Sequence, residues 1–301
     1  MAPLINFYRL LQKLKQPIFS QMKCLLFFFA FIPIHSVAQL NVKAFVCNKK
    51  HEPLPLTNIV SIKTHNGTIT DENGKFQIAE MNVNDTLKIT NISYLPLLIP
   101  VSKITSNDTI FLLDNIKELD EIIVRNWNSY KSAIELGYFN YPNNGEFKLM
   151  PGNQIALYID NPLKKEGIIK GVYFRLKQKG KCENSLRLRL SDISKLDLEP
   201  SLDILNENVI IANTELRSKN YIDLTKYRIL MPQKGVFVIL ELLFPENNCQ
   251  IKSYTSLSAN LSVQKNLVWL NFRDKSWAHN NRPRLPNGNF ITPNISLRVV
   301  Y

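Results

Sequence analysis

The sequence predicts an all-β protein made of two sandwiches that follow an export signal. Three observations support this fold class: short apolar stretches alternate with polar residues, Asn-Gly pairs mark tight turns, and stretches with helical periodicity are short. The 301-residue chain is long enough for two domains of ordinary size. The expected order is a signal peptide at 1–38, a first sandwich at 39–124, a linker at 125–145 and a second sandwich at 146–301.

Residues 1–38 have the organisation of a cleaved export signal. They hold four basic and no acidic residues, then an apolar core from Cys24 to Ile34, then the small residues Ser36 and Ala38 before Gln39. The core is shorter than the roughly 20 residues of a membrane-spanning helix. We therefore expect cleavage before Gln39 and no membrane span afterwards. An uncleaved anchor is the alternative, and Met22 is an alternative start of translation.

Charge and export together limit the class of partner. The net charge falls from +12 to +8 when the four basic residues of the signal are removed. The remaining Lys and Arg are scattered between apolar positions, which is typical of a solvated surface and not of a basic stripe for nucleic acid. We therefore expect no nucleic-acid partner, and a location in the periplasm or at the outer membrane or cell surface.

The first sandwich is predicted from short strands separated by turns. Val42, Ala44 and Val46 alternate with their neighbours, as in a strand with one buried face. The pairs Asn66-Gly67 and Asn73-Gly74 favour tight turns, because Asn and Gly tolerate positive φ. Further strands are expected at 76–78, 87–89 and 109–113.

The order of motifs in this region resembles the carboxypeptidase-regulatory-like domain. The residues that carry the resemblance are Gly67-Thr68, Thr70-Asp71-Glu72-Asn73-Gly74-Lys75-Phe76, Asp85-Thr86-Leu87, Ser93-Tyr94 and Leu119-Asp120-Glu121-Ile122-Ile123-Val124. Ser93 stands where the family usually has Gly. The resemblance implies a seven-stranded, prealbumin- or transthyretin-like sandwich without activity of its own. Such domains occur in TonB-dependent outer-membrane receptors and other envelope proteins of Gram-negative bacteria.

The chain after this region differs from the two best-known contexts of the family. The 177 residues from Arg125 to Tyr301 are too few for a 22-stranded receptor barrel with ~10 residues per strand. The zinc carboxypeptidase domain and its metal ligands are also missing from the sequence. We therefore expect a polar linker, with a short helix at Ser132–Leu136, and then a different domain.

The second sandwich is expected to be jelly-roll-like with eight or nine strands. Leu186, Leu188 and Leu190 alternate with polar residues, so one face of their strand should be buried. The predicted strands lie at 154–159, 168–176, 185–193, 209–212, 221–224, 236–243, 267–272 and 295–301.

Three cysteines lie outside the signal. Cys182 and Cys249 both lie in polar loops of the second sandwich, and exported proteins retain disulfides, so we expect these two to pair. Cys47 ends an apolar strand and is expected to be a buried thiol.

The sequence contains no motif that predicts catalysis, a metal site or a cofactor. The histidines at 51, 65 and 279 lack zinc-ligand spacing, and no nucleophile elbow or phosphate-binding loop is present. Asp71 and Glu72 are expected to bond the backbone of their turn. Glu241 interrupts the apolar stretch 236–244, and a buried carboxylate needs a partner. We expect an ion pair with Arg187 or Arg189.

The best ligand-binding candidate is the segment from Trp269 to Arg284. An exposed Trp277 beside His279, Asn281 and Arg282 has the chemistry to stack on a sugar ring and bond its hydroxyls. In the alternative interpretation, Trp269 belongs to the core and Trp277 covers the edge of the sandwich.

The sequence therefore favours a non-enzymatic envelope protein that binds a glycan or a cell-surface protein. One alternative is a carbohydrate-active hydrolase that uses Glu241 with Asp223 or Asp274 as acid and base. Another alternative is a structural subunit that assembles through an exposed sheet edge.

Overall fold

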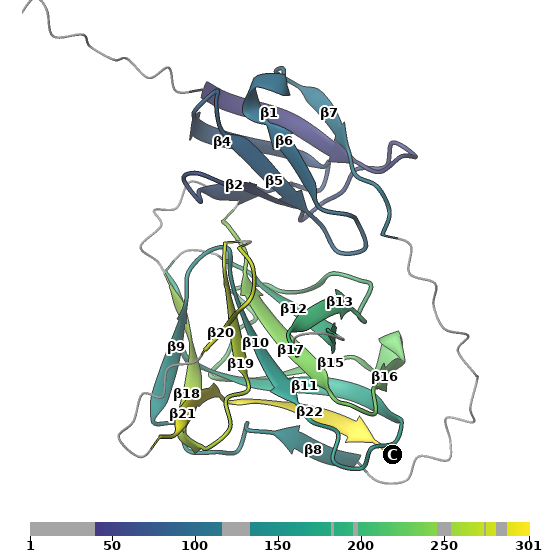
Figure 1. Ribbon diagram of the computed structural model, residues 1–301, viewed down its shortest axis with the longest axis vertical. Helices are drawn as coiled ribbons and strands as arrows, with labels where there is room; N and C mark the ends of the chain where they lie inside the picture. Colours follow the sequence, from purple (N-terminus) through teal and green to yellow (C-terminus); the bar gives the residue numbers. More distant parts are fainter. Residues whose placement is uncertain are drawn as a thin grey trace, which may run out of the picture. The chain divides into compact units, whose positions relative to one another are not determined.

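The protein is all-β, as the sequence predicts (Figure 1). The computed structural model describes residues 40–115, 133–181, 184–194, 198–245, 254–273, 275–280 and 288–301. This part of the chain contains strands and the short 3-10 turns η1 (Val101–Lys103) and η3 (Thr225–Tyr227), but no α-helix. Residues Gln39–Tyr301 form one compact unit. The predicted signal peptide and the predicted Cys182–Cys249 pair lie outside the described residues.

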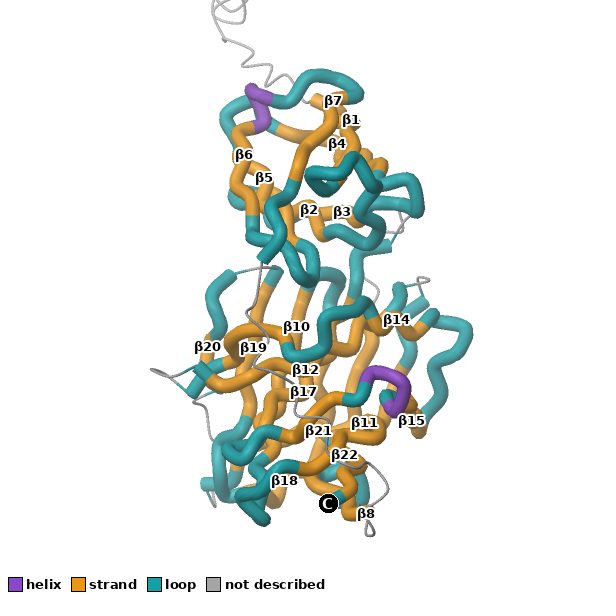
Figure 2. The backbone as a smooth tube through the Cα atoms, turned by 90° about the vertical axis from the view of Figure 1, so that its right-hand side faces the viewer, coloured by secondary structure: helices purple, strands orange, loops and turns teal. Residues whose placement is uncertain are grey.

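The first sandwich has the seven strands that the resemblance implies. One sheet has the order β4-β1-β7 and the other has the order β3-β2-β5-β6 (Figure 2). The strands are β1 (Leu40–Cys47), β2 (Asn58–Ser61), β3 (Gly67–Ile69), β4 (Lys75–Met81), β5 (Thr86–Thr90), β6 (Leu97–Pro100) and β7 (Asp108–Phe111). Alternate residues of β1, which are Val42, Ala44 and Val46, enter the core with Ile59, Phe76 and Leu87. The alternation in the sequence therefore predicts the buried face of β1 correctly.

The second sandwich consists of two larger sheets. The first has seven strands, with the path β13-β12-β17-β10-β19-β20 and β14 paired to β12. These are β10 (Asn153–Ile159), β12 (Leu186–Ile193), β13 (Pro200–Asp203), β14 (Val209–Ile211), β17 (Val236–Leu242), β19 (Val268–Phe272) and β20 (Ala278–His279).

The other sheet has eight strands, with the path β21-β18-β11-β22-β8. Strands β15 and β16 pair with β11, and β9 pairs with β18. The strands are β8 (Ala133–Gly137), β9 (Gly145–Leu149), β11 (Gly167–Gln178), β15 (Lys219–Asp223), β16 (Ile229–Met231), β18 (Thr255–Val263), β21 (Phe290–Pro293) and β22 (Ile295–Val300). Inward-facing Leu, Ile, Val and Phe side chains of both sheets form one continuous core.

Two sequence-based expectations about this region are wrong. The helix predicted at Ser132–Leu136 is strand β8, because residues 133–137 pair along β22 with Leu136 opposite Leu297. The strands also exceed the expected eight or nine, because short edge strands such as β13, β16 and β20 carry too few residues to show a pattern. Since β8 belongs to the eight-stranded sheet, the second sandwich begins within the stretch expected to be linker.

Cys47 is a free cysteine at the end of β1. It is half-buried and not fully buried as expected, since it lies on the side of β1 opposite Val42, Ala44 and Val46. Burial raises the pKa of the Cys47 thiol.

Candidate ligand-binding cleft

The candidate site lies on the outer face of the seven-stranded sheet. Along β17, Val236, Val238 and Leu240 point into the core of the sandwich. The intervening residues Phe237 and Ile239 pack in a separate cluster on the opposite face, although both are fully buried. Around Phe237 and Ile239, the outer face of this sheet is therefore covered by packed side chains.

Strand register arranges the outer face into rows of side chains. Glu241 lies opposite Arg187 on β12 and opposite Gln154 on β10, and Gln154 in turn lies opposite Asn271 on β19. This gives one polar row across four strands. The next row contains Arg189, Ile239, Ala156, Trp269 and His279. A polar row and an aromatic row are thus neighbours on one surface.

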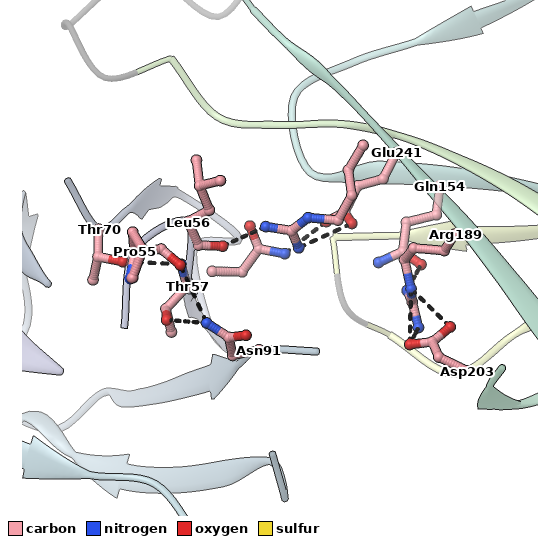
Figure 3. A network of polar contacts seen from close by, with 11 residues as sticks. Pro55, Leu56, Thr57, Thr70, Asn91, Gln154, Arg189, Asp203 and Glu241 are labelled. Carbon is pink, nitrogen blue, oxygen red and sulfur yellow. Dashed lines mark hydrogen bonds and ion pairs between the residues drawn. The ribbon is translucent and has the colours of Figure 1, made fainter. Parts of the chain in front are cut away.

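Glu241 forms the predicted ion pair, and its partner is Arg187. Glu241 Oε2 lies 3.3 Å from Arg187 Nη1, and both side chains are almost fully buried. Asn58 Nδ2 donates a hydrogen bond of 2.6 Å to Glu241 Oε1. Arg187 Nη2 donates to the carbonyl oxygen of Leu56 (Figure 3). Both members of this ion pair therefore also bond to the first sandwich, Glu241 through Asn58 of β2 and Arg187 through Leu56 before it.

Arg189 has different partners, which are Asp203 and Gln154. Its Nε lies 3.2 Å from both carboxylate oxygens of Asp203, and its Nη2 lies 2.9 Å from Oδ2 (Figure 3). Its Nη1 donates to Gln154 Oε1 at 2.9 Å. A planar guanidinium held at several nitrogens has a defined orientation. Arg189, in the next row, is thus held rigidly and reaches the polar row through Gln154.

The aromatic row supports Trp277. Trp277 is half-buried and packs on the cluster formed by Ala156, Phe237, Ile239 and Trp269. Phe237 and Trp269 make an edge-to-face contact with ring centroids 5.0 Å apart. Packing on this cluster limits the rotamers open to the Trp277 ring.

A cleft of about 610 Å³ lies over these rows. From the second sandwich its lining includes Gln154, Arg187, Arg189, Asp203, Glu241, Asn271, Lys275 and Trp277. From the first sandwich the lining includes Asn58, Lys88, Asn91, Tyr94, Asp114 and Asn115. Side-chain amides recur in the lining, and both amide groups and hydroxyls donate and accept hydrogen bonds. The cleft is suited to a polar ligand with a flat apolar face.

The structure brings only part of the predicted ligand set together. Trp277 lines the cleft. His279 is exposed and does not line it, because its ring stacks on Trp269 with centroids 4.1 Å apart. Asn281 and Arg282 lie outside the described residues.

Sequence reasoning missed most of the polar lining. Gln154 is distant in the sequence from Trp277 and faces the cleft through strand register. Asn271 lies within the predicted segment Trp269–Arg284 but was not among its predicted ligand residues. Both are polar residues that interrupt apolar strands, the same signal that marks Glu241 in the sequence.

The residues proposed for a hydrolase do not form an acid–base pair. The carboxylate of Glu241 is occupied by Arg187 and Asn58. Asp223 ends β15 in the other sheet and is exposed. Hydrogen bonds from Thr225 hold the pKa of Asp223 below its ordinary value, the direction opposite to that of a general acid. Asp274 lies outside the described residues.

The described ranges hold neither a cluster of metal ligands nor a membrane-spanning helix. No group of three or more His, Cys, Asp or Glu side chains there is placed to hold a metal ion. Across the same ranges, no helix has the length and apolar character needed to cross a membrane.

Comparison with known proteins identifies the first sandwich. Residues 45–124 match the family described as the CarboxypepD_reg-like domain. The first sandwich is a CarboxypepD_reg-like domain. The resemblance carried by the Thr70–Phe76 turn and its neighbours is thereby confirmed.

The CarboxypepD_reg-like domain also accounts for a match to a curated relative. The TonB-dependent receptor SusC of Bacteroides thetaiotaomicron is 33% identical over 102 residues, which are 34% of this chain and 10% of the receptor. The chain thus spans about a tenth of the length of that relative.

Two solved structures are distantly similar to this chain. The cysteine protease and lectin-like domains of Cwp84, a surface-layer-associated protein of Clostridium difficile, align with 11% identity and a TM-score of 0.36, over 79% of this chain and 46% of that one. A streptococcal ancillary pilin aligns with 10% identity and a TM-score of 0.22, over 75% of this chain and 60% of the pilin. TM-scores this low carry no argument about function.

Proposed function

We propose that this protein is an exported, non-enzymatic envelope protein that binds a glycan in the cleft beside Trp277. The envelope location is supported by the CarboxypepD_reg-like domain and by the match to an outer-membrane receptor protein. The observation that carries the ligand class is Trp277, whose ring packs on an aromatic cluster and lines a cleft rich in amide side chains. Sugars combine a flat apolar ring face with hydroxyls, so they match this combination of stacking and hydrogen-bonding groups.

The charge of the lining favours binding over hydrolysis. Two of its carboxylates, Asp203 and Glu241, are held in ion pairs with arginines. Their oxygens are engaged by the guanidinium groups of Arg187 and Arg189, so these two carboxylates support the ion pairs of the cleft wall.

Trp277→Ala tests the proposal. The exported chain is applied to a glycan array, and we expect loss of most retention, because stacking on one aromatic ring contributes about 0.5–2 kcal/mol. Tyr141→Ala is the matched control, since Tyr141 is an exposed aromatic residue that does not line the cleft. Unchanged retention by Trp277→Ala, with wild-type melting temperature, would refute the site.

A cell-surface protein is the second candidate ligand. Leu202, an exposed apolar residue, lines the cleft. A pull-down with envelope extract that depends on Leu202, while the array stays negative, would favour this candidate.

A further inference from the structure

Two buried amide oxygens of the cleft lack a hydrogen-bond donor within the described part of the chain. These are Asn58 Oδ1 and Asn271 Oδ1. The two residues are 4% and 6% exposed, and both line the cleft. A buried acceptor without a donor is uncommon and costs free energy. In residues that line a cleft, a hydrogen-bond donor of a ligand would complete the hydrogen bonding of such oxygens.

The orientation of both amides is determined by their other partners. Asn58 Nδ2 faces Glu241 Oε1 at 2.6 Å, and a carboxylate oxygen accepts hydrogen bonds, so the nitrogen must be on that side. Asn271 Nδ2 donates to the carbonyl oxygen of Lys275, which also only accepts. Exchanging nitrogen and oxygen in either amide would place two acceptors together. The free atom is therefore an oxygen in both residues.

The two oxygens come from different sandwiches. Asn58 begins β2 of the CarboxypepD_reg-like domain, and Asn271 lies on β19 of the second sandwich. Asn58 contacts Glu241, and Glu241 is two strands away from Asn271 along the polar row. Strands are about 4.8 Å apart, so the Cα atoms of Glu241 and Asn271 are about 10 Å apart. One extended ligand can span this distance.

The charges of the polar row, and Arg189 beside it, are already paired. Arg187 is bonded to Glu241, and Arg189 is bonded to Asp203. A ligand charge would have to compete with these pairs. Neutral hydroxyl donors meet the two free acceptors without disturbing them.

Resting on the proposed function, we propose that the glycan site is composite: Asn58 of the first sandwich and Asn271 of the second each accept a hydrogen bond from a hydroxyl of one neutral saccharide chain. The first sandwich is then a wall of the binding site and not a spacer. Glu241 acts as a positioning residue, because it holds the Asn58 amide with its oxygen free.

The test uses the exported chain, with neutral hexaoses of glucose, xylose and mannose as probes and an acidic galacturonate hexaose for comparison. Affinity is measured by calorimetry, and the side-chain NH₂ signals of Asn58 and Asn271 are followed by NMR. We expect a neutral hexaose to shift both signals. Asn58→Ala and Asn271→Ala should each weaken binding roughly three- to tenfold, the effect of one lost hydrogen bond. Asn84→Ala, an exposed asparagine of the first sandwich outside the cleft, should have no effect.

A chemical change in the ligand gives a second test, whose result for the wild type does not depend on whether the asparagine variants fold normally. Partial O-methylation of the bound hexaose keeps its acceptor atoms and removes donors. Methylation should weaken binding to the wild type more than to Asn271→Ala, because that variant has already lost the acceptor. Equal weakening in both proteins would overturn the assignment of Asn271.

The outcomes separate the two proposals. Binding that depends on Trp277 but shifts neither asparagine signal overturns the composite site and leaves the proposed function standing. A clear preference for the galacturonate probe overturns the neutral ligand class. If the wild type binds none of the array glycans, the proposed function fails and the composite site fails with it.

Discussion

At the scale of single residues, the turn between β3 and β4 shows why its motif is specific. Asp71 Oδ1 accepts hydrogen bonds from the backbone N–H groups of Asn73 and Lys75, each at 2.9 Å. Gly74 has φ +71°, a left-handed conformation that residues with a Cβ rarely adopt. Both positions are therefore required by backbone geometry, and the sequence-based assignment of Asp71 as a turn residue is confirmed.

Gly74→Ala should destabilise the protein by about 2 kcal/mol or more, since it combines positive φ with a close contact. A Cβ at this position would lie 2.5 Å from the carbonyl oxygen of Val46. Gly288→Ala is the matched control: Gly288 has φ +76° but nothing within 4 Å of the added Cβ. Gly288→Ala should lower the free energy of unfolding, measured with urea, by only about 1 kcal/mol. Equal costs would show that contact with Val46 is unimportant.

Asp223 gives a prediction about pH. Because hydrogen bonds from Thr225 lower its pKa, Asp223 should titrate below the ordinary range of an aspartate in an NMR titration of the folded protein. Its contribution to stability is present above the unfolded pKa and is lost as pH falls through the folded pKa. Thr225→Val removes the side-chain hydrogen bond and should raise the Asp223 pKa towards its ordinary value. An upward-shifted Asp223 in the wild type would revive the hydrolase alternative.

At the scale of elements, the pairing of β12 with β17 creates the buried ion pair. Arg187 lies opposite Glu241, whereas Arg189 lies opposite Ile239. Arg189 therefore turns to Asp203 on the neighbouring strand β13. The sequence left both arginines open as partners of Glu241, and strand register selects between them.

Arg187→Met should lower the free energy of unfolding by about 3–5 kcal/mol, because it leaves a buried carboxylate without its cation. Urea unfolding measures this change. The double variant Arg187→Met/Glu241→Leu should recover most of this loss, since it removes both charges. If Arg187→Met alone lowers the free energy of unfolding by less than about 1 kcal/mol, water reaches Glu241, as in a surface ion pair.

At the scale of the whole molecule, the two sandwiches share an apolar contact beside the polar one. Phe244, which follows β17, forms a buried cluster with Val60 and Ile69 of the CarboxypepD_reg-like domain. Gly67 permits this contact, because a Cβ there would lie 2.5 Å from Phe244 Cζ. Arg273 Nη1 also donates to the carbonyl oxygen of His65 at 2.9 Å. These contacts favour cooperative unfolding of residues 39–301.

The substitution Gly67→Ala should therefore lower the stability of the wild-type protein more than it lowers the stability of the Phe244→Ala variant. The clash with the ring is absent in the second background, while the close approach to the carbonyl oxygen of Ile59 at 2.9 Å remains in both. In a double-mutant cycle of thermal unfolding we expect a coupling free energy of about 1 kcal/mol. Additive effects would show that Gly67 and Phe244 do not meet.

Much of the fold could be predicted from local patterns, but little of the site could. Alternation along β1 and β12 and the Asp71–Gly74 turn are properties of neighbouring residues. The cleft is different, because Trp277, Gln154 and Asn58 come from segments that meet only after two sandwiches have formed. Edge strands such as β8 were also missed, since their assignment depends on a partner distant in the sequence.

By itself the sequence determined that this chain is a β protein with a CarboxypepD_reg-like domain, and that Glu241 needs a cation. These follow from periodicity, turn chemistry and the cost of burying a lone charge, which are all local. Only the tertiary structure decided that Arg187 is that cation, that His279 stacks away from Trp277, and that Asn58 lies beside the second sandwich. Such choices depend on strand register and contact between sheets, which no short stretch of sequence contains.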